Sequence, residues 1–424
     1  MFENIHRLSS GKPVAIFGTG SSGSAAKKLL DAIGIKSVMY AENGAGAKSD
    51  FTAIDARNHA LAVYSPAFRP DHKWLCAARA EGVKTICETD LSALAWSGKI
   101  VAITGTNGKT TLTSFVTHLL NRAGFDAIAA GNIGDPLSGF CFEYGGDKNK
   151  IAVCELSSFQ TSALEFLRPD ALLWTNFAPD HLDWHKDMRE YFTAKHNLVK
   201  AMRGELFIAG SSVAHSAASF DIILPKFAKI LDEENPPSAP EPFGSSIQAR
   251  NFDMAINFAE SFGVDGATVR AAAADFKLPA HRFSRPIISR GVRFFNDSKA
   301  TNAHAAIAAL KELKNEKHLV WLGGGKNKHC DISPLVDAVS ESAKAAVLIG
   351  QTAEMLKEVL DKKLPQGAHV CSSMEDAVGR AFALSKEDSA VLFSPGFSSF
   401  GMFSGYADRG KSFENSVLCL KNLK

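Results

Sequence analysis

The chain has 424 residues, roughly three times the length of a typical domain, so we expect two or three domains. Its 47 lysines and arginines almost balance its 45 aspartates and glutamates, which argues against nucleic acid or an anionic membrane as the main partner. Hydrophobic residues make up 46% and charged residues 22%, a mixture that is typical of a globular protein and excludes a disordered chain.

The cysteines and the N-terminal segment indicate a cytoplasmic protein. Seven cysteines are scattered along the chain without a CxxC pair, as expected for reduced thiols. A membrane span requires about 20 apolar residues, and every apolar run in the sequence is shorter than that. The first residues, MFENIHRLSSGK, lack the apolar stretch of an export signal.

Short apolar runs alternate with helical patterns along nearly the whole chain, which predicts an α/β fold with largely parallel sheets. The first run, residues 13–17, leads into GTGSSG at 18–23 and then into a helix that ends near Gly34. This GxGxxG pattern, with Glu42 lying 19 residues beyond Gly23, is typical of NAD binding. The same helix N-terminus would equally bind the diphosphate of a UDP-sugar.

A second strand-turn-helix begins at residues 99–103 and continues through TGTNGKTT at 104–111. The glycines allow successive N–H groups to face a phosphate, Lys109 supplies positive charge, and Thr110 supplies a hydroxyl for Mg²⁺. The helix that follows is amphipathic, and Gly124 is a suitable stop. This context favours an ATP-binding loop over an ordinary glycine-rich turn.

Two further runs end in acidic or imidazole side chains. Residues 151–155 form an apolar run that places Glu155 at its end, where phosphate-loop enzymes carry a carboxylate for Mg²⁺. The run at 172–174 leads to DHLDWH at 180–185, in which His181 is a candidate metal ligand. The alternative for this segment is a polar helix cap headed by Asp180.

Ten residues beyond His181, the sequence predicts a helix with Tyr191 and Lys195 on one face. A lysine at such a position is most often a solvated surface residue. A desolvated lysine near a metal can instead lose its proton and react with CO₂, and the resulting carbamate is an anionic oxygen ligand for Mg²⁺.

The rest of the chain predicts a loop and then a third α/β unit. Residues 232–244 contain four prolines and favour a surface loop inside the second domain. Beyond residue 278, strand patterns alternate with helical ones as in a doubly wound sheet: strands at 292–295, 319–322, 345–349 and 390–393, with helices at 303–313 and 352–360.

Taken together, these motifs resemble those of the Mur ligase family of cell-wall peptide-forming ligases. The resemblance extends over the whole chain in order: GTNGKT at 105–110, GNIG at 131–134, ELSSFQ at 155–160, DHLD at 180–183, YFTAK at 191–195, PAHR at 279–282, NDSKATN at 296–302 and the segment from SPG at 394–396 to DRG at 408–410. ELSSFQ with NDSKATN is similar to the family members that add D-glutamate. Tyr40 stands where the family commonly has an acidic residue for uracil recognition.

The resemblance implies three domains: a Rossmann-like UDP-sugar domain over 1–97, a central P-loop-type ATPase domain over 98–278, and a Rossmann-like domain over 279–424 that closes over ATP and binds the amino acid. It implies that the chain adds D-glutamate to UDP-N-acetylmuramoyl-L-alanine through an acyl phosphate, with ATP and two Mg²⁺ ions. We expect a monomer with no nucleic-acid or membrane partner.

The resemblance also implies roles for individual residues. Lys109, Glu155, His181 and Lys195 would be catalytic, and Thr110, Glu155, His181 and carbamylated Lys195 would bind metal. The remaining residues would contact three ligands: for ATP, Gly105, Thr106, Asn107, Gly108, Lys109, Thr110, Thr111, Asn251, Arg282 and Asp297; for the UDP-sugar, Gly18, Ser21, Ser22, Ser65, Asn132 and Ser157; for D-glutamate, Lys299, Thr301, Lys328, Ser399 and Phe400.

Three alternatives remain at this point. A related ligase could use a different amino acid or UDP-sugar, and would differ only in the first and third domains. A silent nucleotide-binding relative is disfavoured because Lys109, Glu155, His181 and Lys195 are all intact. An NAD-dependent oxidoreductase would need a catalytic acid or base facing the nicotinamide, for which the sequence gives no convincing candidate.

Overall fold

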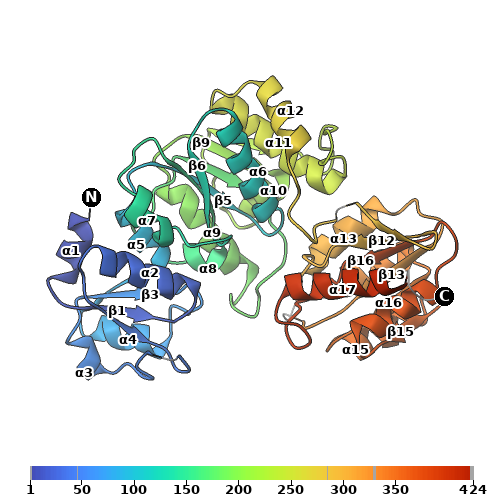
Figure 1. The fold of residues 1–424 in the computed structure, drawn as a ribbon, viewed down its shortest axis with the longest axis horizontal. Helices are drawn as coiled ribbons and strands as arrows, with labels where there is room; N and C mark the ends of the chain where they lie inside the picture. The colour runs from blue at the N-terminus through green and yellow to red at the C-terminus, as the bar shows by residue number, and fades with distance from the viewer. Residues whose placement is uncertain (1, 45, 284, 328–330, 421–424) are drawn as a thin grey trace. The chain divides into compact units, whose positions relative to one another are not determined.

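A computed structural model describes residues 2–44, 46–283, 285–327 and 331–420, and these form three separate β-sheets in succession along the chain (Figure 1). The described residues divide into two compact units. The first unit contains Met1–Phe177, Asp187–Glu241 and Arg250–Phe276. The second contains Ala178–Lys186, Pro242–Ala249 and Lys277–Lys424.

The first sheet has four parallel strands in the order β2-β1-β3-β4. Its strands are β1 Val14–Phe17, β2 Ser37–Tyr40, β3 Leu61–Tyr64 and β4 Lys84–Cys87, and its helices are α1 Glu3–Ser9, α2 Ser21–Ala32, α3 Ala53–Ala56, α4 Lys73–Ala80 and α5 Glu88–Leu94. Side chains of β1 alternate between two apolar clusters, because Val14 and Ile16 belong to one and Ala15 and Phe17 to the other. Both faces are therefore covered, as parallel sheets require.

The second sheet has six parallel strands in the order β10-β9-β8-β5-β7-β6. The strands are β5 Lys99–Thr104, β6 Ala127–Gly131, β7 Ile151–Glu155, β8 Ala171–Trp174, β9 Leu206–Gly210 and β10 Ala228–Leu231. The helices are α6 Lys109–Arg122, α7 Ser138–Tyr144, α8 Ser158–Thr161, α9 Met188–Ala201, α10 Ser211–Ser219, α11 Ser246–Ser261 and α12 Gly266–Asp275. The chain adds β6 and β7 on one side of β5 and β8 to β10 on the other. The carboxyl end of β5 is therefore a topological switch point, where open α/β sheets bind ligands.

The third sheet has the order β11-β12-β16-β13-β14-β15, with only the β11–β12 pair antiparallel among the described strands. Its strands are β11 Ile287–Ser289, β12 Val292–Asn296, β13 Leu319–Gly323, β14 Ala345–Leu348, β15 Ala368–Val370 and β16 Ala390–Phe393. Its helices are α13 Ala303–Glu312, α14 Ser333–Ser342, α15 Ala353–Leu360, α16 Met374–Ala383 and α17 Tyr406–Leu420. Trp321 and Val320 pack into separate clusters on opposite faces of this sheet.

The first and second sheets lie in one unit because a single apolar cluster joins them. Ile16 and Val63 from the first sheet belong to the same cluster as Ala102 and Trp174 from the second. The third sheet has its own two clusters. Burial of about 25 cal/mol per Å² of apolar surface makes such a shared cluster the main force that holds the first two sheets together.

The predicted α/β class and the alternation of strands and helices are confirmed. The predicted helix with Tyr191 and Lys195 on one face is also confirmed as α9. The alternative in which Asp180 heads a helix is wrong, because α9 begins at Met188 and its N-cap is Asp187, whose side chain accepts from Glu190 N. Asp187 is the cap because the helical pattern starts immediately after it.

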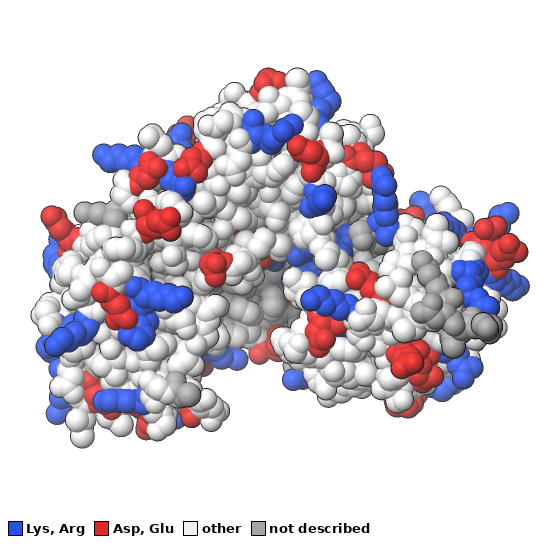
Figure 2. Space-filling model, in the orientation of Figure 1, with Lys and Arg blue, Asp and Glu red and all other residues white. Residues whose placement is uncertain are grey.

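On the face drawn in Figure 2, lysines and arginines are interspersed with aspartates and glutamates, in keeping with the near-zero net charge. Within the described ranges, no helix combines the length and the apolar character that crossing a bilayer demands.

Candidate functional site

The loop between β5 and α6 has the backbone geometry of a phosphate cradle. Gly105 has φ of 140° and Gly108 φ of 84°, both in the region that favours glycine. A Cβ on Gly105 would lie 1.9 Å from Thr175 Oγ1, and a Cβ on Gly108 would lie 2.6 Å from Asn251 Oδ1. The two glycines therefore let the loop approach the end of β8 and α11 closely, and Asn251 lies beside the loop.

Residues that follow β8 hold this loop in place. Thr175 Oγ1 donates to Asn107 O at 2.6 Å, and Asn107 N donates to Asn176 Oδ1 at 2.9 Å. Thr106 N donates to Asn176 O at 3.1 Å. The loop is thus preorganised at the N-terminus of α6, where backbone N–H groups and the helix dipole favour an anion.

Lys109 and Thr110 lie at the start of α6, next to this cradle. Lys109 Nζ donates to the carbonyl oxygens of Gly105 and Thr106, at 2.9 Å each. The ammonium group therefore lies at the loop. Thr111, which follows Thr110 in α6, is buried. This arrangement can bind a polyphosphate by charge and by hydrogen bonds together.

Glu155, at the carboxyl end of β7, has a buried carboxylate with one unsatisfied oxygen. Its Oε1 accepts from Asn132 Nδ2 at 3.1 Å, and its backbone oxygen accepts from Asn132 N at 2.8 Å. Among the residues that the structure describes, no group donates a hydrogen bond to Oε2, although the residue is only 2% exposed. An unpaired buried carboxylate oxygen is costly unless a cation binds it, so this observation fits a metal ligand.

Lys195 projects from α9 toward the loop between β5 and α6, and it is only 1% exposed. Its Nζ donates to Gly105 O at 3.0 Å and to Thr104 Oγ1 at 3.4 Å, and lies 4.9 Å from the centroid of the Tyr191 ring. The Tyr191 hydroxyl oxygen is 3.2 Å from Thr106 Oγ1. Lys195 is therefore not a solvated surface residue, and its burial next to the phosphate loop is unusual for a lysine.

The segment with His181 belongs to the second compact unit. His181 has φ of 57°, and its backbone N–H donates to Asp180 Oδ1 at 2.8 Å. Asp180 Oδ2 lies 3.6 Å from His181 Nε2 and accepts from Asn302 Nδ2 at 3.0 Å. His185 N and Trp184 N both donate to His181 O, which closes a tight turn. The imidazole is about one-third exposed, which leaves it accessible to a ligand.

Arg282 and Asp297 are buried in the second unit, near the carboxyl end of β12. Burial raises the pKa of Asp297 to about 7, against the lowering effects of a hydrogen bond from Ser394 Oγ at 2.8 Å and of Arg282 and Arg409. Burial also lowers the pKa of Arg409 to about 10. Sequence reasoning missed Arg409 as part of this charged cluster, although the DRG motif pointed to it.

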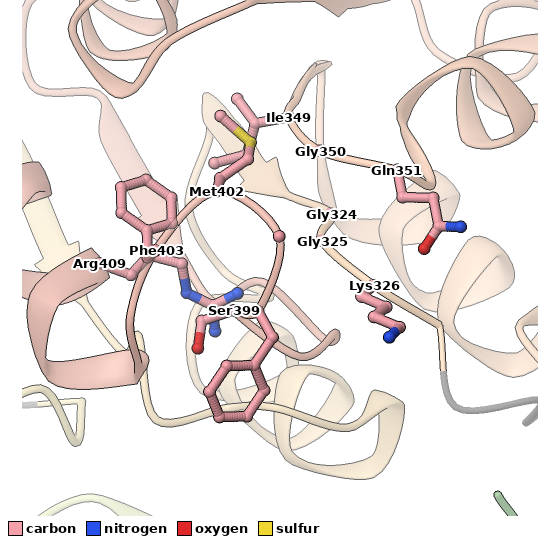
Figure 3. A pocket seen from close by; sticks show the side chains of 12 residues that line it. Gly324, Gly325, Lys326, Ile349, Gly350, Gln351, Ser399, Met402, Phe403 and Arg409 are labelled. Carbon is pink, nitrogen blue, oxygen red and sulfur yellow. The ribbon is translucent and has the colours of Figure 1, made fainter. Parts of the chain in front are cut away.

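The predicted D-glutamate residues occupy several places around the carboxyl edge of the third sheet. Ser399 and Phe400 line a cavity of about 500 Å³, in which Lys326 and Gln351 lie on one side and Met402 and Phe403 on the other (Figure 3). Thr301 lines a separate hollow of about 20 Å³.

The two remaining predictions for D-glutamate fall elsewhere. Lys299 Nζ lies 4.0 Å from the centroid of the Tyr406 ring. Lys328 lies outside the described residues. Lys326 lines both the cavity and the small hollow, and sequence reasoning passed over it in favour of Lys328, two positions further along the same glycine-lysine run.

In the first sheet, Gly18, Ser21, Ser22 and Ser65 come together at the carboxyl ends of β1 and β3. Gly18 has φ of 103°, and a Cβ there would lie 3.2 Å from Ser65 Cβ. Ser21 and Ser22 begin α2, whose N-cap Gly20 has no side chain to occupy the first amide groups. These amides fit a phosphate ligand.

Two other predicted substrate residues lie on the second sheet. Asn132 is paired with Glu155, as above, and Ser157 forms a capping box with Gln160 at the start of α8. Ser157 therefore has a local structural role.

Tyr40 is a core residue. It is 1% exposed and packs edge-on against Phe17 and Phe51. His59 Nδ1 donates to Pro13 O at 2.6 Å, so its Nε2 accepts from the Tyr40 hydroxyl at 2.9 Å. Burial raises the pKa of Tyr40, which keeps the phenol neutral.

Comparison with known proteins shows the family. Family models described as the Mur ligase middle domain and the Mur ligase, glutamate ligase domain match residues 103–222 and 281–397. A UDP-N-acetylmuramoylalanine–D-glutamate ligase of Gloeobacter violaceus is 32% identical over 445 residues, covering 96% of this chain and 99% of that protein. One from Caulobacter sp. is also 32% identical and covers 96% of each chain.

A solved structure supports the fold. The MurF ligase of Thermotoga maritima in complex with ADP matches with a TM-score of 0.61 and 15% identity, covering 91% of this chain and 95% of that one. The family models and the full-length relatives confirm the resemblance inferred from the motifs. With matching models over its second and third sheets and relatives that cover almost its whole length, this chain belongs to the Mur ligase family.

Proposed function

We propose that this protein joins D-glutamate to UDP-N-acetylmuramoyl-L-alanine at the expense of ATP, in the cytoplasmic synthesis of the peptidoglycan precursor. One observation carries the chemistry: a phosphate cradle whose Gly105 carbonyl accepts a hydrogen bond from a buried lysine, Lys195, in the same unit as the carboxylate of Glu155 with its unsatisfied oxygen. The full-length relatives named as D-glutamate ligases support the choice of substrates.

The reaction needs activation of a poor acyl donor. A terminal carboxylate of the UDP-sugar substrate attacks the γ-phosphorus of ATP, and ADP leaves with the electrons of the broken P–O bond. The amine of D-glutamate then adds to the acyl phosphate carbonyl, loses a proton, and the tetrahedral intermediate expels inorganic phosphate. Each step brings anions together, so the protein contributes charge compensation and orientation.

Lys109 would balance charge on the β- and γ-phosphates, while the loop amides orient them. Asn251, beside Gly108, would contact the nucleotide from the same unit. Arg282 and Asp297 would complete the nucleotide site from the second unit, Arg282 reaching phosphate and Asp297 the ribose. We also propose three domains, at 1–97, 98–278 and 279–424, each of which contains one of the three sheets.

The residues fit magnesium. The unpaired Oε2 of Glu155, the Thr110 hydroxyl and the accessible His181 imidazole are suitable donors, and Lys195 would join them as a carbamate. Bound Mg²⁺ would supply Lewis-acid stabilisation of phosphoryl oxygens, and we propose two ions. The ammonium group of Lys195 first loses one proton, and the neutral amine then adds CO₂ and releases a second proton, so that a buried cation becomes a buried anion.

The substrates would bind at the carboxyl edges of the sheets. Gly18, Ser21, Ser22 and Ser65 would hold the diphosphate of the UDP-sugar at α2. Asn132 would contact the substrate near its reacting end, and Ser157 would be a further contact with it. Lys299, Thr301, Lys328, Ser399 and Phe400 would form the D-glutamate pocket. Two lysines suit a ligand with two carboxylates.

Phosphate release tests the proposal. The purified protein, ATP, Mg²⁺ and UDP-N-acetylmuramoyl-L-alanine would be combined with D-glutamate, L-glutamate, L-lysine or no amino acid. We expect release only with D-glutamate. Equal release with every amino acid, or none with any muramyl precursor, would refute the assignment. Lys109→Ala, with an unchanged melting temperature, controls for contaminating ATPases.

A further inference from the structure

The carboxylate of Asp180 connects two parts of the proposed site. Its Oδ1 accepts from the backbone N–H of His181 at 2.8 Å, and its Oδ2 accepts from Asn302 Nδ2 at 3.0 Å. Oδ2 also lies 3.6 Å from His181 Nε2. Asp180 is only 4% exposed, so these contacts are sheltered from water. Charge-assisted hydrogen bonds in such surroundings are strong and directional.

Asn302 is itself fixed at the start of a helix. Its Oδ1 accepts from Ala305 N at 2.9 Å as the N-cap of α13, while its Nδ2 faces Asp180. The amide is therefore oriented from both ends, and its position is tied to α13. Thr301, the preceding residue, is one of the proposed D-glutamate contacts.

Asp180 and the amino-acid residues surround the same small hollow. Asp180, Thr301, Asn302 and Lys326 all line it. Along the chain, residues 178–186 lie between β8 and α9, and α9 carries Lys195. The aspartate therefore lies where the His181 turn meets the edge of the proposed amino-acid pocket.

We infer that Asp180 is a positioning residue that couples D-glutamate binding to the placement of His181. The inference rests on the proposed function. D-glutamate bound at Thr301 would hold the start of α13, Asn302 would hold Asp180, and Asp180 would hold the His181 backbone in its left-handed conformation, with φ of 57°. Asp180 acts through its two neighbours and takes no part in the chemical steps.

An exchange of the two side chains tests this coupling. Asp180→Asn leaves one oxygen to accept from two donors, so one hydrogen bond is lost. Asn302→Asp keeps the helix cap but sets two carboxylates against each other. In the double variant D180N/N302D, the new amide accepts from His181 N and donates to the new carboxylate, which still caps α13. Asn302→Ser is a further control, because serine caps equally well but lacks the Nδ2 donor.

We expect each single variant, Asn302→Ser included, to lose about tenfold or more in kcat/KM for D-glutamate. The KM values for ATP and the UDP-sugar should change by less than about threefold. The double variant should recover to within about threefold of the natural protein. A second readout is the rise in melting temperature caused by D-glutamate when the UDP-sugar, Mg²⁺ and a non-hydrolysable ATP analogue are present, which the single variants should reduce and the double variant restore.

Three results would overturn the inference, and the first two are single variants with unchanged kcat/KM for D-glutamate and a folded double variant no better than the weaker single one. A uniform rise in all three KM values with a lower melting temperature would also overturn it, because that pattern indicates a merely structural role. If the natural protein itself releases no phosphate with D-glutamate, it is the proposed function that fails.

Discussion

Lys195 Nζ, buried on α9, donates to the carbonyl oxygen of Gly105 at 3.0 Å. The two residues are far apart in sequence, yet this bond places a side-chain nitrogen directly beneath the phosphate loop. An ammonium in so little water is costly, and the conversion of its amine to a carbamate would make an anion where the proposed cations bind.

Lys195→Ala should therefore lose most of the activity, by about 100-fold or more, and regain part of it when short carboxylic acids are added. An added carboxylate could occupy the position of the lost carbamate. Rates of phosphate release with and without acetate or propionate provide the measurement. Lys195→Arg is the matched control, because arginine keeps the positive charge and cannot be carbamylated. A folded alanine variant that no acid rescues would contradict the carbamate.

Glu155→Gln should separate stability from activity. Removal of the charge relieves an unpaired buried oxygen, so the melting temperature in magnesium-free buffer should rise by a few degrees, equivalent to about 1–3 kcal/mol. Activity should fall by about 100-fold or more because the variant loses the proposed metal ligand.

The control for Glu155→Gln is Glu88→Gln. Glu88 is equally buried, but its Oε1 accepts from Ser92 Oγ and Ser138 N, so its replacement should lower the melting temperature. Destabilisation by Glu155→Gln of the same size as that by Glu88→Gln would contradict the unpaired state of Glu155.

Gly108→Ala should impair ATP binding. The new Cβ would lie 2.6 Å from Asn251 Oδ1, in a residue with φ of 84°, so both the backbone and the neighbouring side chain would have to move. We expect the KM for ATP to rise about tenfold or more. Gly124→Ala has the same backbone strain, with φ of 86°, and no heavy atom within 4 Å of the new Cβ, so it should cost only about 1 kcal/mol of stability. An equal KM for ATP in the two variants would contradict a clash between the new Cβ and Asn251.

The stability of the second unit should depend on Asp297. Burial raises the pKa of this carboxyl to about 7 in the folded protein, whereas it is near 3.8 in the unfolded chain. Between these values the folded state binds the extra proton, so the free energy of unfolding should fall as the pH rises from about 4 to about 7, by a few kcal/mol at most. Asp297→Asn should flatten this slope in urea titrations at fixed pH values. Parallel slopes for the two proteins would show that another group is responsible.

Tyr40→Phe should affect stability and leave substrate binding unchanged. The variant removes the hydroxyl that bonds to His59 Nε2 and retains the aromatic packing, so it should cost about 1 kcal/mol. Because the ring is buried, the KM for the UDP-sugar should stay within about twofold of the natural value. A large rise in this KM with an unchanged melting temperature would place the hydroxyl in the uracil site instead.

Local signals in the sequence were sufficient for the phosphate loop. Gly105, Gly108 and Lys109 are adjacent in the chain, and the strand before them and the amphipathic helix after them are visible as periodic patterns. The structure confirms each of these elements, because turns, caps and helix starts depend on contacts between residues a few positions apart. Local signals were not sufficient for Asp180, because an aspartate is as suitable for a helix cap there as at Asp187, and it is Asp187 that precedes the first turn of α9.

The sequence by itself determined the α/β class, the phosphate loop and, through its ordered motifs, the family. The tertiary structure decided what each polar side chain meets: Lys195 against Gly105, Asp180 against Asn302, and Tyr40 inside the core against His59. Those pairs depend on the order of strands in a sheet and on which faces are buried together. Such order follows from the packing of apolar surface across the whole domain, and no local pattern encodes it.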